Sequence, residues 1–146
     1  MKISIGLIIA AATALAGCAT PMRRDAVVVG EAVCAPSRFE VYFRENQAAL
    51  TAAASQAIAL QAERLLDCDI RRVQVLGLAD ATGASEANMP LSQRRARTVA
   101  EALAGAGLPA PVFDLSAAGD AGATTASGAE QPLRRRTEVL IDARPR

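Results

Sequence analysis

The sequence predicts an α+β fold in which two helices pack on one face of a mixed four-stranded sheet. Segments with the two-residue alternation of half-buried strands and segments with helical spacing of apolar residues follow one another in the order β-α-β-α-β-β. A loop rich in Gly and Ala separates the last two strands. Because 146 residues suffice for one compact domain, we expect a single sheet with the helices layered on it.

The first strand and the first helix follow each other closely. Phe39 to Phe43 alternates in the manner of a half-buried strand. Asn46 is placed to cap a helix, and residues 47 to 66 are rich in Ala and contain no Gly or Pro. Apolar residues recur there at helical spacing, at Leu50, Ala54, Ala57, Ile58 and Leu65.

The second half of the predicted domain repeats the alternation of strand and helix. Residues 71 to 78 form a strand pattern, and a helix is expected from Asn88, a favourable N-cap, to the glycine at position 105. A short third strand is expected over residues 112 to 117, and the last strand over residues 138 to 143. The low-complexity loop lies between these two strands.

The composition excludes several classes of function. The chain has no His, which removes the commonest general base and the commonest metal ligand. Its three Cys contain no close pair of the kind found in zinc sites. The 16 basic and 15 acidic side chains leave no strong field to attract nucleic acid. We therefore expect no metal, no cofactor, no catalytic residues and no nucleic-acid partner.

The chain begins with the features of an export signal over residues 1–17. A positive residue precedes an apolar run that is shorter than the roughly twenty residues needed to span a bilayer. The run ends in Leu15-Ala16-Gly17-Cys18, which resembles a bacterial lipobox. That resemblance implies cleavage before Cys18, acylation of Cys18 with lipid such as palmitate and, because Ala19 rather than Asp follows, transfer to the outer membrane. An ordinary signal peptide, with Cys18 incidental, is the alternative.

Residues 18–38 are expected to be a lipidated N-terminus and tether that leads to the domain at residues 39–146. Val27 to Val29 could add an edge strand, and the sequence leaves this open. Cys34 and Cys68 form an even pair in an exported chain, which favours a disulfide between the segment before the first strand and the end of the first helix. Two buried free thiols are the alternative.

One arginine interrupts the apolar stripe of the second predicted helix. Arg95 lies four residues after Leu91 and four before Val99, so all three share a face. An inward arginine is costly unless its charge is paired, whereas one at the edge of the stripe can extend into water. Asp80, expected at the end of a strand before a Gly-containing loop, is a candidate partner. The two charges could form a structural ion pair or together hold a zwitterionic ligand.

The residues around this loop carry a family resemblance. The peptidoglycan-binding motif of the OmpA-like domain family is matched, at the same intervals, by Gly77, Asp80, Gly83, Asn88, Leu91, Ser92, Arg95 and Ala96. Residues 41 to 43 resemble the family's first strand, and Arg135-Arg136 resembles the paired arginines of its last strand. The resemblance covers residues 39 to 142. Together with the lipobox it implies a Pal-like lipoprotein, anchored by lipid in the outer membrane, whose domain faces the periplasm.

The resemblance also implies a ligand and a set of site residues. Asp80 and Arg95 would bind the zwitterionic end of meso-diaminopimelate in the peptidoglycan stem peptide, so that the protein anchors the outer membrane to the cell wall without catalysis. The expected site comprises Asp80, Arg95, Asn88, Leu91, Gly83 and Arg135. Asn88 is expected to be first a helix cap, and either Arg135 or Arg136 could line the site. Replacing Asp80 or Arg95 with Ala is expected to abolish wall binding without unfolding the domain.

Two positions depart from the family pattern and support a second hypothesis. Leu78 and Ala79 stand where the family has His and then Thr or Ser, so a hydroxyl hydrogen bond worth about 1 kcal/mol is lost. The alternative function is an OmpA-like envelope lipoprotein that has lost wall binding and contacts envelope proteins instead. A cell-wall hydrolase is disfavoured because the chain has no His. Asp120 is expected to be a solvated loop charge.

Overall fold

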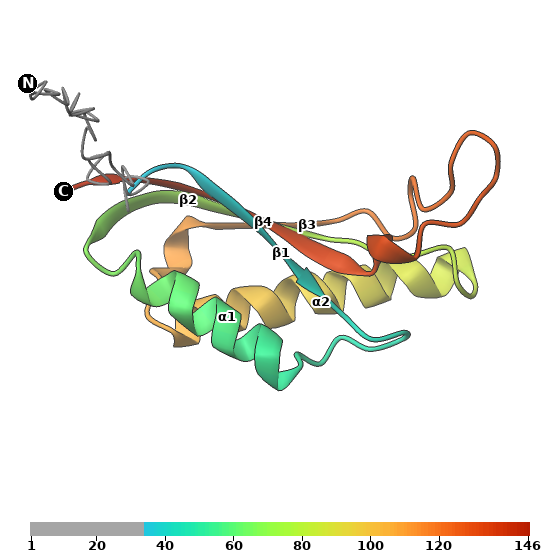
Figure 1. Cartoon of the computed structure of the whole chain (residues 1–146), viewed down its shortest axis with the longest axis horizontal. Helices are drawn as coiled ribbons and strands as arrows, with labels where there is room; N and C mark the ends of the chain where they lie inside the picture. Colours follow the sequence, from blue (N-terminus) through green and yellow to red (C-terminus); the bar gives the residue numbers. More distant parts are fainter. Residues whose placement is uncertain (1–33) are drawn as a thin grey trace, which may run out of the picture.

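In a computed structural model, which describes residues 34–146, four strands form one mixed sheet and two helices pack against one of its faces (Figure 1). The elements are β1 (Ser37–Tyr42), α1 (Ala52–Glu63), β2 (Cys68–Gly77), α2 (Ser85–Gly105), η1 (Ala110–Val112), β3 (Phe113–Ala117), η2 (Pro132–Arg134) and β4 (Arg136–Pro145). This architecture confirms the predicted fold class. The predictions for the export signal, for Cys18 and for Val27 to Val29 concern residues outside the described part.

The last strand lies in the middle of the sheet. The strand order is β1-β4-β2-β3, with β4 antiparallel to both β1 and β2, and β2 parallel to β3. Helix α2 makes the crossover between the parallel pair, as such a connection requires. The sheet is therefore complete only when the C-terminal residues have added between β1 and β2.

The core fills the space between the sheet and the helices. Val73 and Val75 on β2 and Val139 on β4 are fully buried, and they pack with Ile58 of α1 and Val99 of α2.

Among the described residues, no helix is long and apolar enough to cross a membrane.

Gly77, the last residue of β2, lets α2 approach the sheet closely. A Cβ atom at this position would lie 1.9 Å from the main-chain oxygen of Ser92 on α2. Any larger residue would therefore push the helix away from the strand. This contact fixes the middle of α2 against the end of β2, three residues before Asp80.

Both helices begin at other residues than the sequence indicated. Helix α1 begins at Ala52, because Thr51 is its N-cap and accepts a hydrogen bond of 3.1 Å from the amide of Ala54. Asn46, expected as the cap, instead has a positive φ of 51° in the preceding turn. Helix α2 begins at Ser85, so Asn88 lies inside its first turn and is not its cap. Both cap predictions were wrong.

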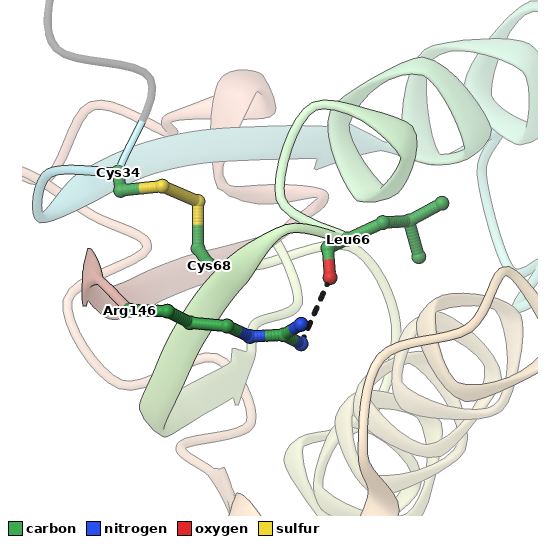
Figure 2. The surroundings of a disulfide bond; sticks show 4 residues. All are labelled: Cys34, Leu66, Cys68 and Arg146. Carbon is green, nitrogen blue, oxygen red and sulfur yellow. Dashed lines mark hydrogen bonds between the residues drawn. A yellow bond between two sulfur atoms is a disulfide. The ribbon is translucent and has the colours of Figure 1, made fainter.

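The predicted disulfide is present and lies at the end of the sheet near the C-terminus (Figure 2). Cys34 and Cys68 are bonded, with their Cα atoms 5.4 Å apart. Strand β2 begins at Cys68 rather than at residue 71, so the bond joins the segment before β1 directly to a central strand. Beside it, the Arg146 guanidinium donates a hydrogen bond of 3.1 Å to the carbonyl oxygen of Leu66. The alternative of two free thiols is therefore wrong.

Candidate functional site

Asp80 lies just beyond the end of β2 and is only 5% exposed. Its Oδ2 accepts a hydrogen bond of 2.8 Å from Nη1 of Arg135, which forms a part-buried ion pair. Its Oδ1 accepts a longer bond of 3.3 Å from the amide of Thr82 in the loop that follows. The carboxylate is thus held between the loop before α2 and the residue that precedes β4.

Arg95 is fully buried, and its guanidinium is bonded to the main chain. Nε donates to the carbonyl oxygen of Gln47 at 2.9 Å, Nη1 to that of Leu78 at 2.9 Å and Nη2 to that of Arg44 at 3.2 Å. The guanidinium also lies 5.1 Å from the centroid of the Phe43 ring, within the range of a cation–π contact. The alternative in which Arg95 extends from the edge of the stripe into water is therefore wrong.

The charges of Asp80 and Arg95 act on each other although no hydrogen bond joins them. Burial lowers the pKa of Arg95, because removal from water penalises the charged form. The nearby charge of Asp80 opposes this by raising the pKa, whereas Arg135 and Arg94 lower it further. One carboxylate therefore lies within the fields of two guanidinium groups, those of Arg95 and Arg135.

The burial of Arg95 corrects one expectation from the sequence. Its side chain is among the largest fully buried ones in the described part of the chain, and it holds three separate main-chain segments. Removing it would leave the buried carbonyl group of Leu78 without this donor, at a cost of about 1–3 kcal/mol, and would release the part-buried carbonyl groups of Arg44 and Gln47. The Arg95→Ala substitution is therefore no longer expected to leave the fold intact.

Of three consecutive arginines before and at the start of β4, only Arg135 reaches the candidate site. Arg134 donates to the carbonyl oxygen of Ala121 in the long loop. Nη2 of Arg136 lies 2.7 Å from Oε1 of Glu138, and this ion pair is on the face of the sheet that carries no helix. The side chain of Arg135 is 30% exposed and turns to Asp80. The sequence left the choice between Arg135 and Arg136 open, and the structure brings Arg135 to Asp80.

Asn88 belongs to a second polar cluster at the start of α2. Asp120, from the loop after β3, accepts a bond of 2.9 Å from the Ser85 hydroxyl and one of 3.3 Å from the Asn88 amide. These bonds, that from Ser85 foremost, lower the pKa of Asp120. A carboxylate at a helix N-terminus also interacts favourably with the helix dipole. Asp120 is therefore not the simple solvated charge that the sequence suggested.

Ser92 and Gly119 hold this second cluster in place. The Ser92 hydroxyl donates to the carbonyl oxygen of Met89 at 2.8 Å and accepts from the amide of Gly119 at 3.0 Å. The carbonyl oxygen of Gly119 in turn accepts from the amide of Ala79 at 2.7 Å. The loop that carries Asp120 is thereby tied to both α2 and the residue before Asp80. The sequence placed Ser92 in the family motif but gave no sign of its bond to Gly119, which lies 27 residues further along the chain.

The remaining residues of the expected site occupy different environments. Leu91 is 6% exposed and faces the interior from α2. Gly83 is exposed in the loop before α2, where its φ of 88° favours glycine, and an added Cβ would meet nothing within 4 Å. Leu78 and Ala79 are both buried. Asp80, Arg95 and Arg135 are therefore the charged residues that the fold brings together.

The fold and the motif together define the family. A family model described as the OmpA family matches residues 42–137, and the chain belongs to this family. No curated protein matches the chain in sequence.

Solved structures share the fold. The OmpA-like domain of FopA1 from Francisella tularensis superposes with a TM-score of 0.64 at 24% identity, covering 75% of this chain and 73% of that one. The peptidoglycan-associated lipoprotein from Burkholderia pseudomallei gives 0.58 at 22% identity, with coverage of 70% and 88%. The periplasmic domain of Helicobacter pylori MotB (residues 90-256) gives 0.59 at 17% identity, with coverage of 73% and 74%.

Proposed function

We propose that this protein is a non-catalytic lipoprotein that anchors the outer membrane to peptidoglycan by binding the diaminopimelate of the stem peptide. The observation that carries the proposal is the grouping of one carboxylate, Asp80, with two guanidinium groups at the end of β2 in an OmpA-family domain. One of the solved structures with this fold is a peptidoglycan-associated lipoprotein, which supports the proposed ligand.

The two kinds of charge match the two charges of an amino-acid zwitterion. Asp80 would accept hydrogen bonds from the ligand ammonium through the carboxylate lone pairs that Arg135 and Thr82 leave free. Arg95 would donate to the ligand carboxylate through N–H groups beyond those bonded to the main chain. Because Arg95 is enclosed in the free domain, the ligand would have to enter where Asp80 and Arg135 meet.

A lipid on the N-terminal cysteine would anchor the binding domain to the outer membrane. Cys18 would carry the lipid after removal of residues 1–17, and residues 18–38 would link it to the domain. The protein would then lie on the periplasmic side of the outer membrane, within reach of the cell wall. The lipobox sequence supports this part of the proposal.

The proposal is tested by co-sedimentation of residues 19–146 with purified diaminopimelate-type peptidoglycan. The wild type should pellet with the wall, and Asp80→Ala should remain in solution while still unfolding in one cooperative transition, at a lower temperature because Arg135 loses its partner. Asp114→Ala, which removes an exposed carboxylate on β3, is the matched control and should pellet. A wild-type protein that stays in solution would contradict wall binding.

The second candidate function is a protein-interaction module of the envelope that has lost wall binding. It is favoured by Leu78 and Ala79, which bury aliphatic side chains where the family has His and a hydroxyl residue. It is also favoured by the pairing of Asp80 with Arg135, since the carboxylate already has a cationic partner within the chain. This alternative predicts no sedimentation with the wall and a specific cross-link to an envelope protein in cells.

A further inference from the structure

Arg135 uses only part of its hydrogen-bonding capacity. Its Nη1 is bonded to Asp80 at 2.8 Å, whereas its Nε and Nη2 have no acceptor among residues 34–146. Its side chain is 30% exposed, in contrast to the fully buried Arg95. The guanidinium therefore presents an open edge, made of Nε and Nη2, beside the Asp80 carboxylate. Such an edge matches the two oxygen atoms of a carboxylate.

The site holds more positive than negative charge. Asp80 contributes one negative charge, and Arg95 and Arg135 contribute one positive charge each. Asp120 belongs to the separate cluster with Ser85 and Asn88, and it is not among the charges that shift the pKa of Arg95. A zwitterionic ligand adds no net charge and would leave this surplus in place. A ligand with a further carboxylate would neutralise it.

We propose that Arg135 makes the site selective for a ligand that carries a second carboxylate beside its zwitterionic end. The Nε–Nη2 edge would take this second carboxylate while Nη1 stays on Asp80. The inference rests on the proposed function and narrows its ligand. Diaminopimelate has two amino-acid ends, and in a stem peptide that stops at this residue the carboxylate of the second end is free. The site would therefore prefer such peptides over those in which this carboxyl group is an amide.

The positions of the two arginines separate their roles. Arg95 holds the main chain at Arg44, Gln47 and Leu78, so its loss would disturb the fold and binding together. Within residues 34–146 the Arg135 side chain makes a single hydrogen bond, to Asp80. Its replacement should therefore change which ligands bind and leave the fold in place, which makes the selectivity measurable.

The experiment is calorimetric titration of a protein comprising residues 19–146 with two synthetic peptides. This protein contains the whole domain seen in the structure, residues 34–146. One peptide is the tripeptide L-Ala-γ-D-Glu-meso-diaminopimelate, and the other has the carboxyl of the second end converted to a carboxamide. The wild type should bind the tripeptide about tenfold more tightly, as expected for one charge-assisted contact. Arg135→Gln should bring the two affinities within about twofold by weakening only the tripeptide.

Two further variants give the comparison its controls. Arg134→Gln removes the same charge from the neighbouring residue, whose side chain turns to Ala121, and should keep the tenfold preference. Arg135→Lys keeps the charge but loses the planar edge, and should give a preference between those of the wild type and Arg135→Gln. Thermal melts establish that each variant is folded.

Equal affinity of the wild type for both peptides, or a preference that survives in Arg135→Gln, would overturn the assignment to Arg135 while leaving the proposed function standing. Failure of both peptides to bind the folded wild type would overturn the proposed function, and the selectivity with it.

Discussion

Nη1 of Arg95 donates a hydrogen bond of 2.9 Å to the carbonyl oxygen of Leu78, two residues before Asp80. A side chain on α2 thereby holds the point at which β2 ends and the loop of the candidate site begins. The same guanidinium reaches the turn after β1 through Arg44 and Gln47. A buried charge thus supports the fold, and its pKa responds to the charge of Asp80.

We expect Arg95→Ala to lower the free energy of unfolding by about 3 kcal/mol or more, because the buried carbonyl group of Leu78 and the part-buried ones of Arg44 and Gln47 lose their donor and a cavity is left. Urea denaturation measures the change. Arg94→Ala, which truncates the exposed neighbour on the same helix, should change stability by less than about 0.5 kcal/mol. An Arg95→Ala protein with the wild-type midpoint would show that the main-chain bonds contribute little.

Gly77→Ala should be strongly destabilising, since the added Cβ would lie 1.9 Å from the main-chain oxygen of Ser92. Either α2 or the end of β2 must move, so binding at Asp80 should fall as well. Gly105→Ala is the matched control, because an added Cβ there meets nothing within 4 Å. That change, at the end of α2, should be neutral or stabilising by up to about 1 kcal/mol. Thermal unfolding of both variants tests the comparison.

Removal of the Cys34–Cys68 bond should cost about 3–4 kcal/mol, the chain-entropy value for a loop closed over 34 residues. Thermal unfolding of residues 19–146 with and without reductant measures this, because no other Cys remains in that chain. The double variant Cys34→Ser, Cys68→Ser should match the reduced protein and be insensitive to reductant. Equal melting temperatures under both conditions would contradict the prediction.

Acid should weaken the domain partly through Asp120, whose pKa the hydrogen bonds from Ser85 and Asn88 hold below the usual value of 3.8. The folded protein favours the ionised carboxylate more than the unfolded chain does, so this stabilisation is present above the unfolded pKa. It is lost as the pH falls below 3.8 and through the lower folded pKa. Asp120→Asn should therefore lose less stability than the wild type between pH 6 and pH 3 in urea unfolding. Ser85→Ala should lie between the two, and identical pH dependence in all three would contradict the role of Asp120.

The order of elements could be predicted because alternation and helical spacing are local properties of the chain. The helix starts could not, because capping depends on backbone conformation and on partners far along the sequence. Asn46 and Asn88 are both favourable caps by residue type. The chain instead turns through a positive φ at Asn46. At the start of α2, the side chains of Ser85 and Asn88 bond to the carboxylate of Asp120, which lies more than thirty residues further along the chain.

The inward direction of Arg95 could be inferred from the spacing of Leu91 and Val99. Its partners could not, because a main-chain carbonyl carries no sequence signature. The sequence also could not predict which of the three consecutive arginines pairs with Asp80. It depends on the short turn η2 and the start of β4, which direct neighbouring side chains to Ala121, Asp80 and Glu138.

The disulfide also determines how the domain bears mechanical load. A pull applied through the chain before Cys34 would otherwise act first on β1, an edge strand that could be peeled from β4 one residue pair at a time. The bond to Cys68 transfers that force to β2, which has strands on both sides and packs against α2. Force then has to shear β2 from β4 and from β3 at the same time. The domain should therefore unfold at a higher force with the disulfide formed than with it reduced.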